Sequence, residues 1–137
     1  MKNYLKAEFD SKSVNEGLSR IIVAGFIMPL DPTIEQMADV KTAVSEAVTN
    51  AIIHGYENKE GLVTLELTTE DRLLTVKVQD EGVGIEDITM ARMPLFTSKP
   101  DCDRSGMGFT VMESFMDSLH ITSQKNIGTT VIMTKKL

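Results

Sequence analysis

Alternating apolar and polar residues predict two β-hairpins in this chain. The runs 62–69 and 73–80 alternate and are separated by only three residues, so we expect them to pair as antiparallel strands. The runs 119–123 and 129–135 show the same alternation, and we expect a second hairpin there. Residues 3–9 are expected to form a short edge strand.

Two helices are predicted between the edge strand and the first hairpin. Ser13 and Glu16 have the spacing of a capping box, and the helix that they open should end near Met28. Asp31 is then expected to cap a second helix, with a proline at its first helical position. Gly55 is expected to stop that helix. Its apolar residues form one helical stripe: Met37, Val40, Val44, Ala47, Val48 and Ala51.

A polar stretch without a clear period follows the first hairpin and reaches about Ser105, before a third helix predicted over 106–117. Such a long irregular stretch in a compact domain is typical of a functional lid or of a disordered loop. The order of the elements predicts an α+β sandwich, with helices on one face of a mainly antiparallel sheet.

The second half of the first helix, residues 21–28, is apolar on every face. A helix of this kind is normally buried on more than one side. Either the core of the domain covers it fully, or a partner chain covers one of its sides, and the sequence leaves both interpretations open.

Composition and charge narrow the class of protein. The chain has 137 residues, which fits one domain over 1–137, and its net charge is −6 at pH 7. This charge argues against direct binding to nucleic acid, because such binding depends on neutralising phosphates. The single cysteine, Cys102, rules out an internal disulfide, and no signal peptide or membrane-spanning run is found. We therefore expect a cytoplasmic protein.

The second helix carries three polar residues of interest. Glu46, Asn50 and His54 follow one another at four-residue spacing, so they share one face of a regular helix, opposite the apolar stripe. That face is either an ordinary solvated surface or a surface covered by a ligand or lid. Ile53 lies between Glu46 and Asn50 on the same face, and an apolar residue there favours a covered surface.

Asp80 is unexpected for a different reason. It has the same strand parity as Leu74, Val76 and Val78, which predicts that its side chain faces the core. A buried carboxylate needs hydrogen-bond donors. Either the strand ends at Gln79 and Asp80 turns into solvent, or Asp80 forms the floor of a pocket and accepts a hydrogen bond from a ligand amine, such as that of adenine.

Two glycine-containing turns complete the candidate site. Gly82 and Gly84 follow Asp80 directly and permit close approach of the backbone to a ligand. Gly106 and Gly108 open the third helix, whose exposed N–H groups favour phosphate. The stretch before that helix holds two cations that could contact phosphate, Lys99 and Arg104.

Taken together and in this order, these motifs resemble the Bergerat-fold (GHKL) superfamily of ATPases and kinases. They are E-x-x-x-N-x-x-x-H-G on a helix, D-x-G-x-G after a strand, a lid, G-x-G-F opening a helix, and a late G-T pair. The small size and the run VSEAVTNAIIHGY resemble the anti-sigma factor serine kinases within it. PLFTSKP…RSGMGFTVMESFMD is most similar to the sporulation anti-sigma F factors.

The resemblance implies ATP and Mg²⁺ as cofactors and assigns a role to each matching residue. Asn50 would bind Mg²⁺, Glu46 would act as general base, Asp80 would read adenine, and Thr129 would lie near adenine. Thr129 has the same strand parity as Val131 and Met133, which predicts that it faces the core. Arg104 would contact the terminal phosphates from the lid, and His54 is expected to be structural. The residues expected to line the nucleotide are Gly82, Gly84, Ile85, Gly106, Gly108 and Phe109.

The resemblance also implies partners. Proteins of this family sequester a sigma factor, form homodimers and phosphorylate a serine on an anti-anti-sigma factor. Two alternatives are an ATP-dependent binding module without transferase activity and the catalytic domain of a histidine kinase. Glu46 favours the kinase over the binding module, and the chain shows no second domain with an acceptor histidine.

Overall fold

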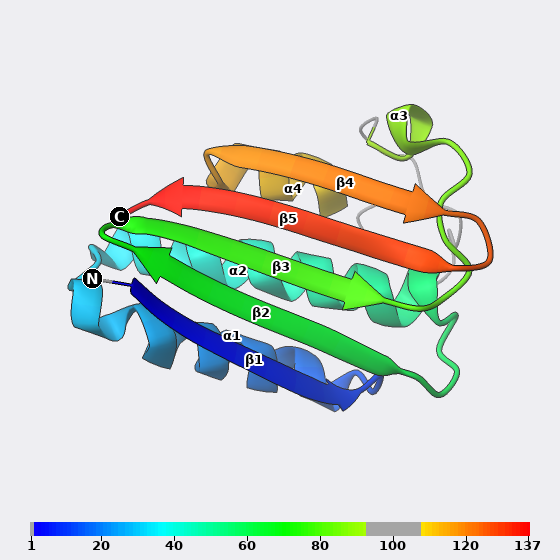
Figure 1. Ribbon diagram of the computed structural model, residues 1–137, viewed down its shortest axis with the longest axis horizontal. Coiled ribbons are helices and arrows are strands. Elements are labelled where there is room, and N and C mark those ends of the chain that lie inside the picture. The colour runs from blue at the N-terminus through cyan, green and yellow to red at the C-terminus, as the bar shows by residue number, and fades with distance from the viewer. Residues whose placement is uncertain (1, 93–107) are drawn as a thin grey trace.

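The computed structural model describes residues 2–92 and 108–137. Over these residues the strands form one five-stranded sheet in the order β1-β2-β3-β5-β4, with every neighbouring pair antiparallel (Figure 1). The predicted edge strand and both predicted hairpins are therefore confirmed. The strands are β1 (Lys2–Asp10), β2 (Leu62–Glu70), β3 (Leu73–Asp80), β4 (Ser118–Gln124) and β5 (Gly128–Lys136).

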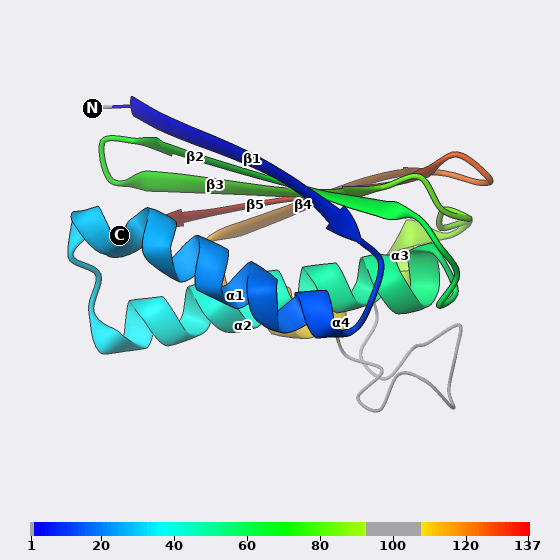
Figure 2. The same cartoon turned by 90° about the horizontal axis from the view of Figure 1, so that it is seen from below.

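The helices cover one face of this sheet and leave the other face open (Figure 2). The order of elements confirms the predicted α+β sandwich. None of the described helices is long and apolar enough to cross a membrane. The helical segments are α1 (Val14–Ile27), η1 (Met28–Leu30), α2 (Ile34–Asn50), η2 (Ala51–Gly55), α3 (Ile88–Ala91) and α4 (Gly108–Phe115).

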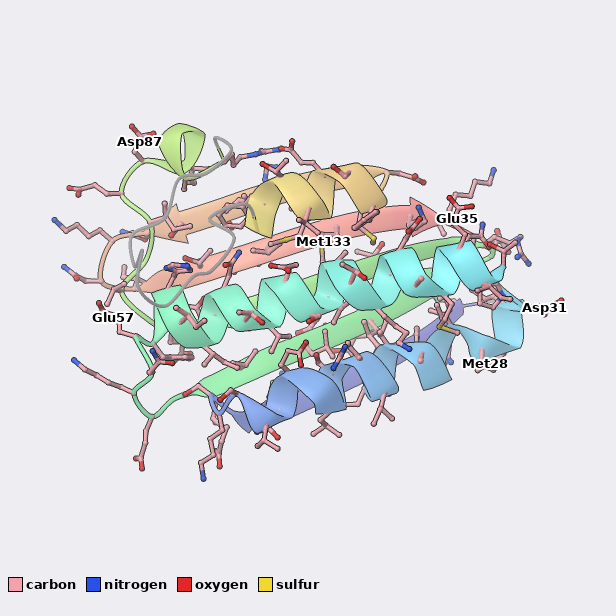
Figure 3. The ribbon with its side chains drawn as sticks, turned by 180° about the vertical axis from the view of Figure 1, so that it is seen from behind. Met28, Asp31, Glu35, Glu57, Asp87 and Met133 are labelled. Carbon is pink, nitrogen blue, oxygen red and sulfur yellow. The ribbon has the colours of Figure 1, made fainter. Side chains whose placement is uncertain are left out.

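The core lies between the sheet and the helices. Alternate residues of β2 and β3 are buried, as the period-two pattern of these strands requires. The α2 helix lies across the middle of the sheet, between α1 and α4, and it contributes Val40, Val44 and Val48 to the core. Met133 of β5 is fully buried and points toward the region between α2 and α4 (Figure 3).

The first helix starts where it was predicted, with Ser13 directly before α1, but the predicted capping box is wrong. Ser13 has helical dihedral angles and no side-chain capping bond, and the carboxylate of Glu16 accepts a hydrogen bond from Ser45 on α2. The predicted start of the second helix is wrong. The second helix is capped by Thr33, whose hydroxyl accepts from the Gln36 amide while the Gln36 side chain accepts from the Thr33 amide. These two reciprocal hydrogen bonds satisfy two backbone N–H groups that would otherwise lack partners at the start of the helix. Asp31 lies before the helix and adopts a left-handed conformation with φ of 50°.

Two further expectations need correction. Glu70 pairs with Leu73, so the first hairpin has a two-residue turn rather than a three-residue loop, and Asp71 takes a positive φ of 55°. The stretch expected to lack regular structure contains one turn of helix, α3. The start of the predicted third helix at 106–107 lies outside the described residues, and the described helix ends at Phe115 rather than 117.

Candidate nucleotide-binding site

A row of polar side chains crosses one end of the sheet on the face that the helices cover. Asp80 of β3 pairs with Thr129 of β5, and Thr129 pairs with Ser123 of β4. The adjacent row on the same face is apolar and buried, and consists of Val78, Val131 and Ile121. The hydrophobic core therefore ends at a line of oxygen-bearing side chains.

Asp80 is buried, with 7% of its surface exposed, so the prediction from strand parity is confirmed and its alternative, a side chain in solvent, is wrong. The Gly82 amide donates to Asp80 Oδ1 at 2.9 Å. Burial raises the pKa of Asp80 to about 6, although backbone N–H donors from Gly82 and Thr129 oppose the shift. The hydrogen bonds that the protein donates to Asp80 thus offset only part of the cost of burying its negative charge, and the carboxylate can accept a hydrogen bond from another donor.

The end of the second helix packs directly against this carboxylate. A Cβ atom placed on Gly55 would lie 2.7 Å from Asp80 Oδ1, so only glycine fits there. A Cβ atom placed on Gly82 would come closer still to the Gly55 carbonyl oxygen, which accepts a hydrogen bond from the Val83 amide at 2.9 Å. The two segments hold each other in place.

Tyr56 strengthens the same junction. Its hydroxyl accepts from the Glu81 amide at 2.8 Å and donates to the Leu62 carbonyl at 2.5 Å. Burial raises the pKa of Tyr56, so the phenol stays protonated and can perform both tasks. The residue that follows Asp80 is therefore fixed to the end of α2 and to the start of β2.

The turn after Asp80 continues toward β4. Gly84 has φ of 75°, a left-handed conformation that favours glycine, and lies against the Gln124 carbonyl. The next amide, that of Ile85, donates to Ser123 Oγ at 2.6 Å. The D-x-G-x-G turn is thus bonded to the end of the polar row.

Glu46 and Asn50 lie one turn apart on α2, and both are half-buried. A Cβ atom placed on Gly108 would lie 2.9 Å from Asn50 Nδ2 and 3.1 Å from its Oδ1, so the start of α4 contacts the Asn50 amide. The interpretation of this face as an ordinary solvated surface is therefore wrong for Asn50.

The position of His54 differs from the prediction. Residues Ala51–Gly55 form a π-helical turn, in which the Tyr56 amide bonds to the Ala51 carbonyl five residues earlier. This wider turn rotates His54 relative to a continuous α-helix, so it does not follow Glu46 and Asn50 at regular helical spacing. The same turn brings Gly55 against Asp80.

The remaining predicted site residues divide into three groups. Thr129 is buried in the polar row, as its strand parity predicted. Phe109 is buried in the core and Ile85 packs against it. Lys99, Arg104 and Gly106 lie outside the described residues, as does the single cysteine, Cys102. At the borders of that segment, the Arg92 guanidinium forms an ion pair with Glu113 of α4.

Sequence reasoning overlooked three residues of this site, namely Ser123, Gly55 and Tyr56. Ser123 has the same parity as Leu119 and Ile121 on its strand, so strand parity predicts that its side chain faces the core, as it does for Asp80. The contacts of Gly55 and Tyr56 depend on the π-helical turn, which no periodicity in the sequence predicts.

The described residues fit a magnesium nucleotide. Asn50 supplies an oxygen atom beside the N-terminus of α4, Glu46 lies one turn before it on α2, and Asp80 supplies an acceptor for an amine. Within the described part of the chain, no group of three or more His, Cys, Asp or Glu side chains could hold a metal ion. Mg²⁺ suits such a site, because it takes most of its ligands from phosphates and water.

Comparison with known proteins agrees with this arrangement. Residues 15–135 match the histidine kinase-like ATPase domain family. The chain is 61% identical over 133 residues to the anti-sigma F factor of Clostridium kluyveri, covering 97% of this chain and 94% of that protein. It is 59% identical over 136 residues to the anti-sigma F factor of Clostridium acetobutylicum, covering 99% and 95%. It is 56% identical over 138 residues to that of Clostridium perfringens, covering 100% and 99%.

These matches extend over nearly all of the chain and include every described residue of the candidate site. The fold, the motifs and the matches therefore agree that the chain belongs to the histidine kinase-like ATPase domain family and, within it, to the anti-sigma F factors.

Proposed function

We propose that this chain is an anti-sigma factor that inhibits a sigma factor of the sigma F type in sporulation, and that it uses Mg-ATP to phosphorylate a serine of an anti-anti-sigma factor. The names of its relatives support the sigma factor as a partner. The observation that carries the kinase activity is Glu46, a half-buried carboxylate one helical turn from Asn50. A pure binding module has no need of a base at that position.

The proposed roles follow from the chemistry of the site residues. Asp80 accepts a hydrogen bond from the adenine amine, and Thr129 lies beside it. The Asn50 carbonyl binds Mg²⁺, and the N–H groups at the start of α4 bind phosphate. When bound, Mg²⁺ neutralises charge that develops on the phosphates.

Glu46 acts on the protein substrate. The serine oxygen forms a bond to the γ-phosphorus while the bond between that phosphorus and the bridging oxygen of ADP breaks. The serine proton passes to the Glu46 carboxylate, and ADP is the leaving group. Such a reaction depends mainly on placing the hydroxyl in line and within hydrogen-bond reach of the base.

The first experiment is a transfer assay with labelled ATP, Mg²⁺ and an anti-anti-sigma factor from a sporulating clostridium. We expect label on one serine of that partner, identified by mass spectrometry. Nucleotide binding without any label on the partner would favour the alternative, an ATP-dependent binding module. Acid-labile label on a histidine would instead favour a histidine-kinase type of activity.

We further propose that the chain forms a homodimer through an exposed apolar stripe that follows α1 and ends at Met28, the first residue of η1. Val14, Leu18, Ile21 and Met28 are 77%, 42%, 72% and 59% exposed, with Gly25 exposed between the last two. Their alternating spacing of four and three residues is that of a helix–helix seam. The opposite face of α1 packs into the core through Val23, Phe26 and Ile27.

Substitution of Ile21 by glutamate should convert the dimer to a monomer, because it places a charge at the centre of the stripe. Native mass spectrometry and sedimentation equilibrium measure the result, with and without ATP and the sigma factor. The matched control is Ile127→Glu, since Ile127 is 58% exposed in the turn between β4 and β5, away from α1 (Figure 1). An Ile21→Glu protein that remains dimeric would exclude this interface.

A further inference from the structure

Ser123 occupies the end of the polar row and connects three parts of the site. Its Oγ accepts a hydrogen bond from the Ile85 amide at 2.6 Å. The same atom lies 2.8 Å from Thr129 Oγ1 and 3.1 Å from the Gly128 carbonyl oxygen. Ser123 therefore contacts three groups: the backbone of the turn after Asp80, the carbonyl of Gly128 on β5 and the hydroxyl of Thr129.

The number of hydrogen bonds that a serine can form limits what these contacts mean. A hydroxyl has one proton and two acceptor lone pairs, and the Ile85 amide occupies one of the lone pairs. The proton of Ser123 can go to the Gly128 carbonyl at 3.1 Å or to Thr129 Oγ1 at 2.8 Å, a pair in which either hydroxyl can be the donor, and the shorter distance is the usual one for two hydroxyl oxygens. When Ser123 donates to Thr129, the proton of Thr129 is left to donate elsewhere.

The chemistry of adenine makes that free proton useful. The amine of adenine is a donor, and the neighbouring ring nitrogen N1 is an acceptor. An ionised carboxylate can only accept, so Asp80 suits the amine. Thr129 is the direct cross-strand neighbour of Asp80, about 5 Å away at Cα, and a threonine held as a donor suits N1.

We infer that Ser123 is a positioning residue for base recognition, which orients the Thr129 hydroxyl as a hydrogen-bond donor to N1 of adenine. This inference rests on the proposed binding of ATP. Ser123 acts through Thr129, because its own oxygen is already surrounded by the Ile85 amide, the Gly128 carbonyl and the Thr129 hydroxyl.

The test compares two nucleotides by calorimetry: ATP and 1-deaza-ATP, in which a C–H group replaces N1. We expect Ser123→Ala to weaken ATP binding about tenfold, which corresponds to one hydrogen bond. The same substitution should change the affinity for 1-deaza-ATP by less than about twofold, because the acceptor that Thr129 reads is missing. Equal losses for both nucleotides would show a merely structural role and would overturn the inference, as would unchanged ATP affinity.

The matched control is Ser118→Ala. Ser118 lies on the same strand and its Oγ hydrogen-bonds to Thr134 Oγ1, the same kind of serine–threonine pair across β4 and β5, but on the exposed face. We expect this variant to bind both nucleotides as the wild type does. Wild-type protein that fails to bind ATP would contradict the proposed function itself, whereas the inference about Ser123 concerns only how the variants differ from it.

A second variant keeps the test informative if Ser123→Ala does not fold. Thr129→Val removes the hydroxyl that Ser123 orients and keeps the shape of the side chain. It should weaken ATP but not 1-deaza-ATP, and adding Ser123→Ala to it should cause less than about a twofold further loss for ATP. Additive losses in the double variant would mean that Ser123 acts independently of Thr129, and would overturn the inference.

Discussion

Replacement of Asp80 by alanine is expected to weaken ATP binding by about 10- to 150-fold. Losing a charged hydrogen-bond partner of a bound ligand typically costs about 1.5–3 kcal/mol. Asp80 has 7% of its surface exposed, so water cannot replace the lost carboxylate easily. Isothermal calorimetry with ATP and Mg²⁺ measures the change.

The pKa of Asp80 adds a pH dependence to this prediction. Burial raises that pKa from 3.8 to about 6, so the ionised form that accepts the adenine amine becomes scarce below pH 6. The affinity of the wild type should then fall by up to about tenfold for each pH unit below 6. Since the phosphates of ATP titrate as well, the quantity to follow is the ratio of wild-type affinity to that of Asp80→Asn, which should approach one as the pH falls.

The same pKa implies that ionised Asp80 lowers the stability of the folded protein. A rise from 3.8 to about 6 means that ionised Asp80 destabilises the folded state by about 3 kcal/mol, a penalty that is absent below pH 3.8 and develops as the pH rises through 6. A ligand amine relieves part of this penalty. Asp80→Asn should therefore remain folded at neutral pH, and melting curves separate lost binding from lost structure.

Glu81→Ala is the matched control for Asp80. Glu81 carries the same charge on the next residue, its side chain is exposed, and its hydrogen bond to Tyr56 comes from its backbone amide. We expect its ATP affinity to stay within about twofold of the wild type, because exposed charges interact weakly. If Glu81→Ala and Asp80→Ala weakened binding equally, the effect would come from general electrostatics and Asp80 would not be the adenine acceptor.

Strand parity was the most informative signal in the sequence. It predicted the two hairpins, the burial of Asp80 and the inward direction of Thr129, because alternation along a half-buried strand allows one register only. The same alternation includes Ser123, whose partial burial could have been inferred from Ile121 two residues before it. The place of Ser123 in the candidate site follows only from the strand order β3-β5-β4, because that order aligns Asp80, Thr129 and Ser123 in one row.

The helix boundaries were harder to predict because several residues compete for each cap. Asp31 followed by a proline is an ordinary start signal, yet Thr33 with Gln36 satisfies two donors instead of one. The π-helical turn at Ala51–Gly55 could not be predicted, because its hydrogen bond depends on tertiary packing against Asp80 and the turn after it. The sequence therefore identified candidate site residues, while packing determined how they meet.

Replacement of Glu46 by glutamine should depress phosphoryl transfer by about 10²- to 10⁴-fold, the usual contribution of a general base. Glutamine keeps the size and the hydrogen-bonding reach of the side chain but cannot accept the serine proton. ATP affinity should stay within about threefold of the wild type, since Asn50, Asp80 and the start of α4 remain. A transfer assay with labelled ATP and calorimetry on the same protein measure the two quantities.

The matched control for this variant is Glu35→Gln, in the first turn of the same helix and at the end opposite to Asn50 (Figure 3). The Glu35 side chain is exposed. The substitution removes one carboxylate from α2 and should leave both transfer and ATP binding unchanged. Full transfer activity in Glu46→Gln would show that the serine proton leaves by another route, such as water or a phosphate oxygen. Loss of ATP binding together with transfer would instead make Glu46 part of the nucleotide site, so only a selective loss of transfer identifies Glu46 as the base.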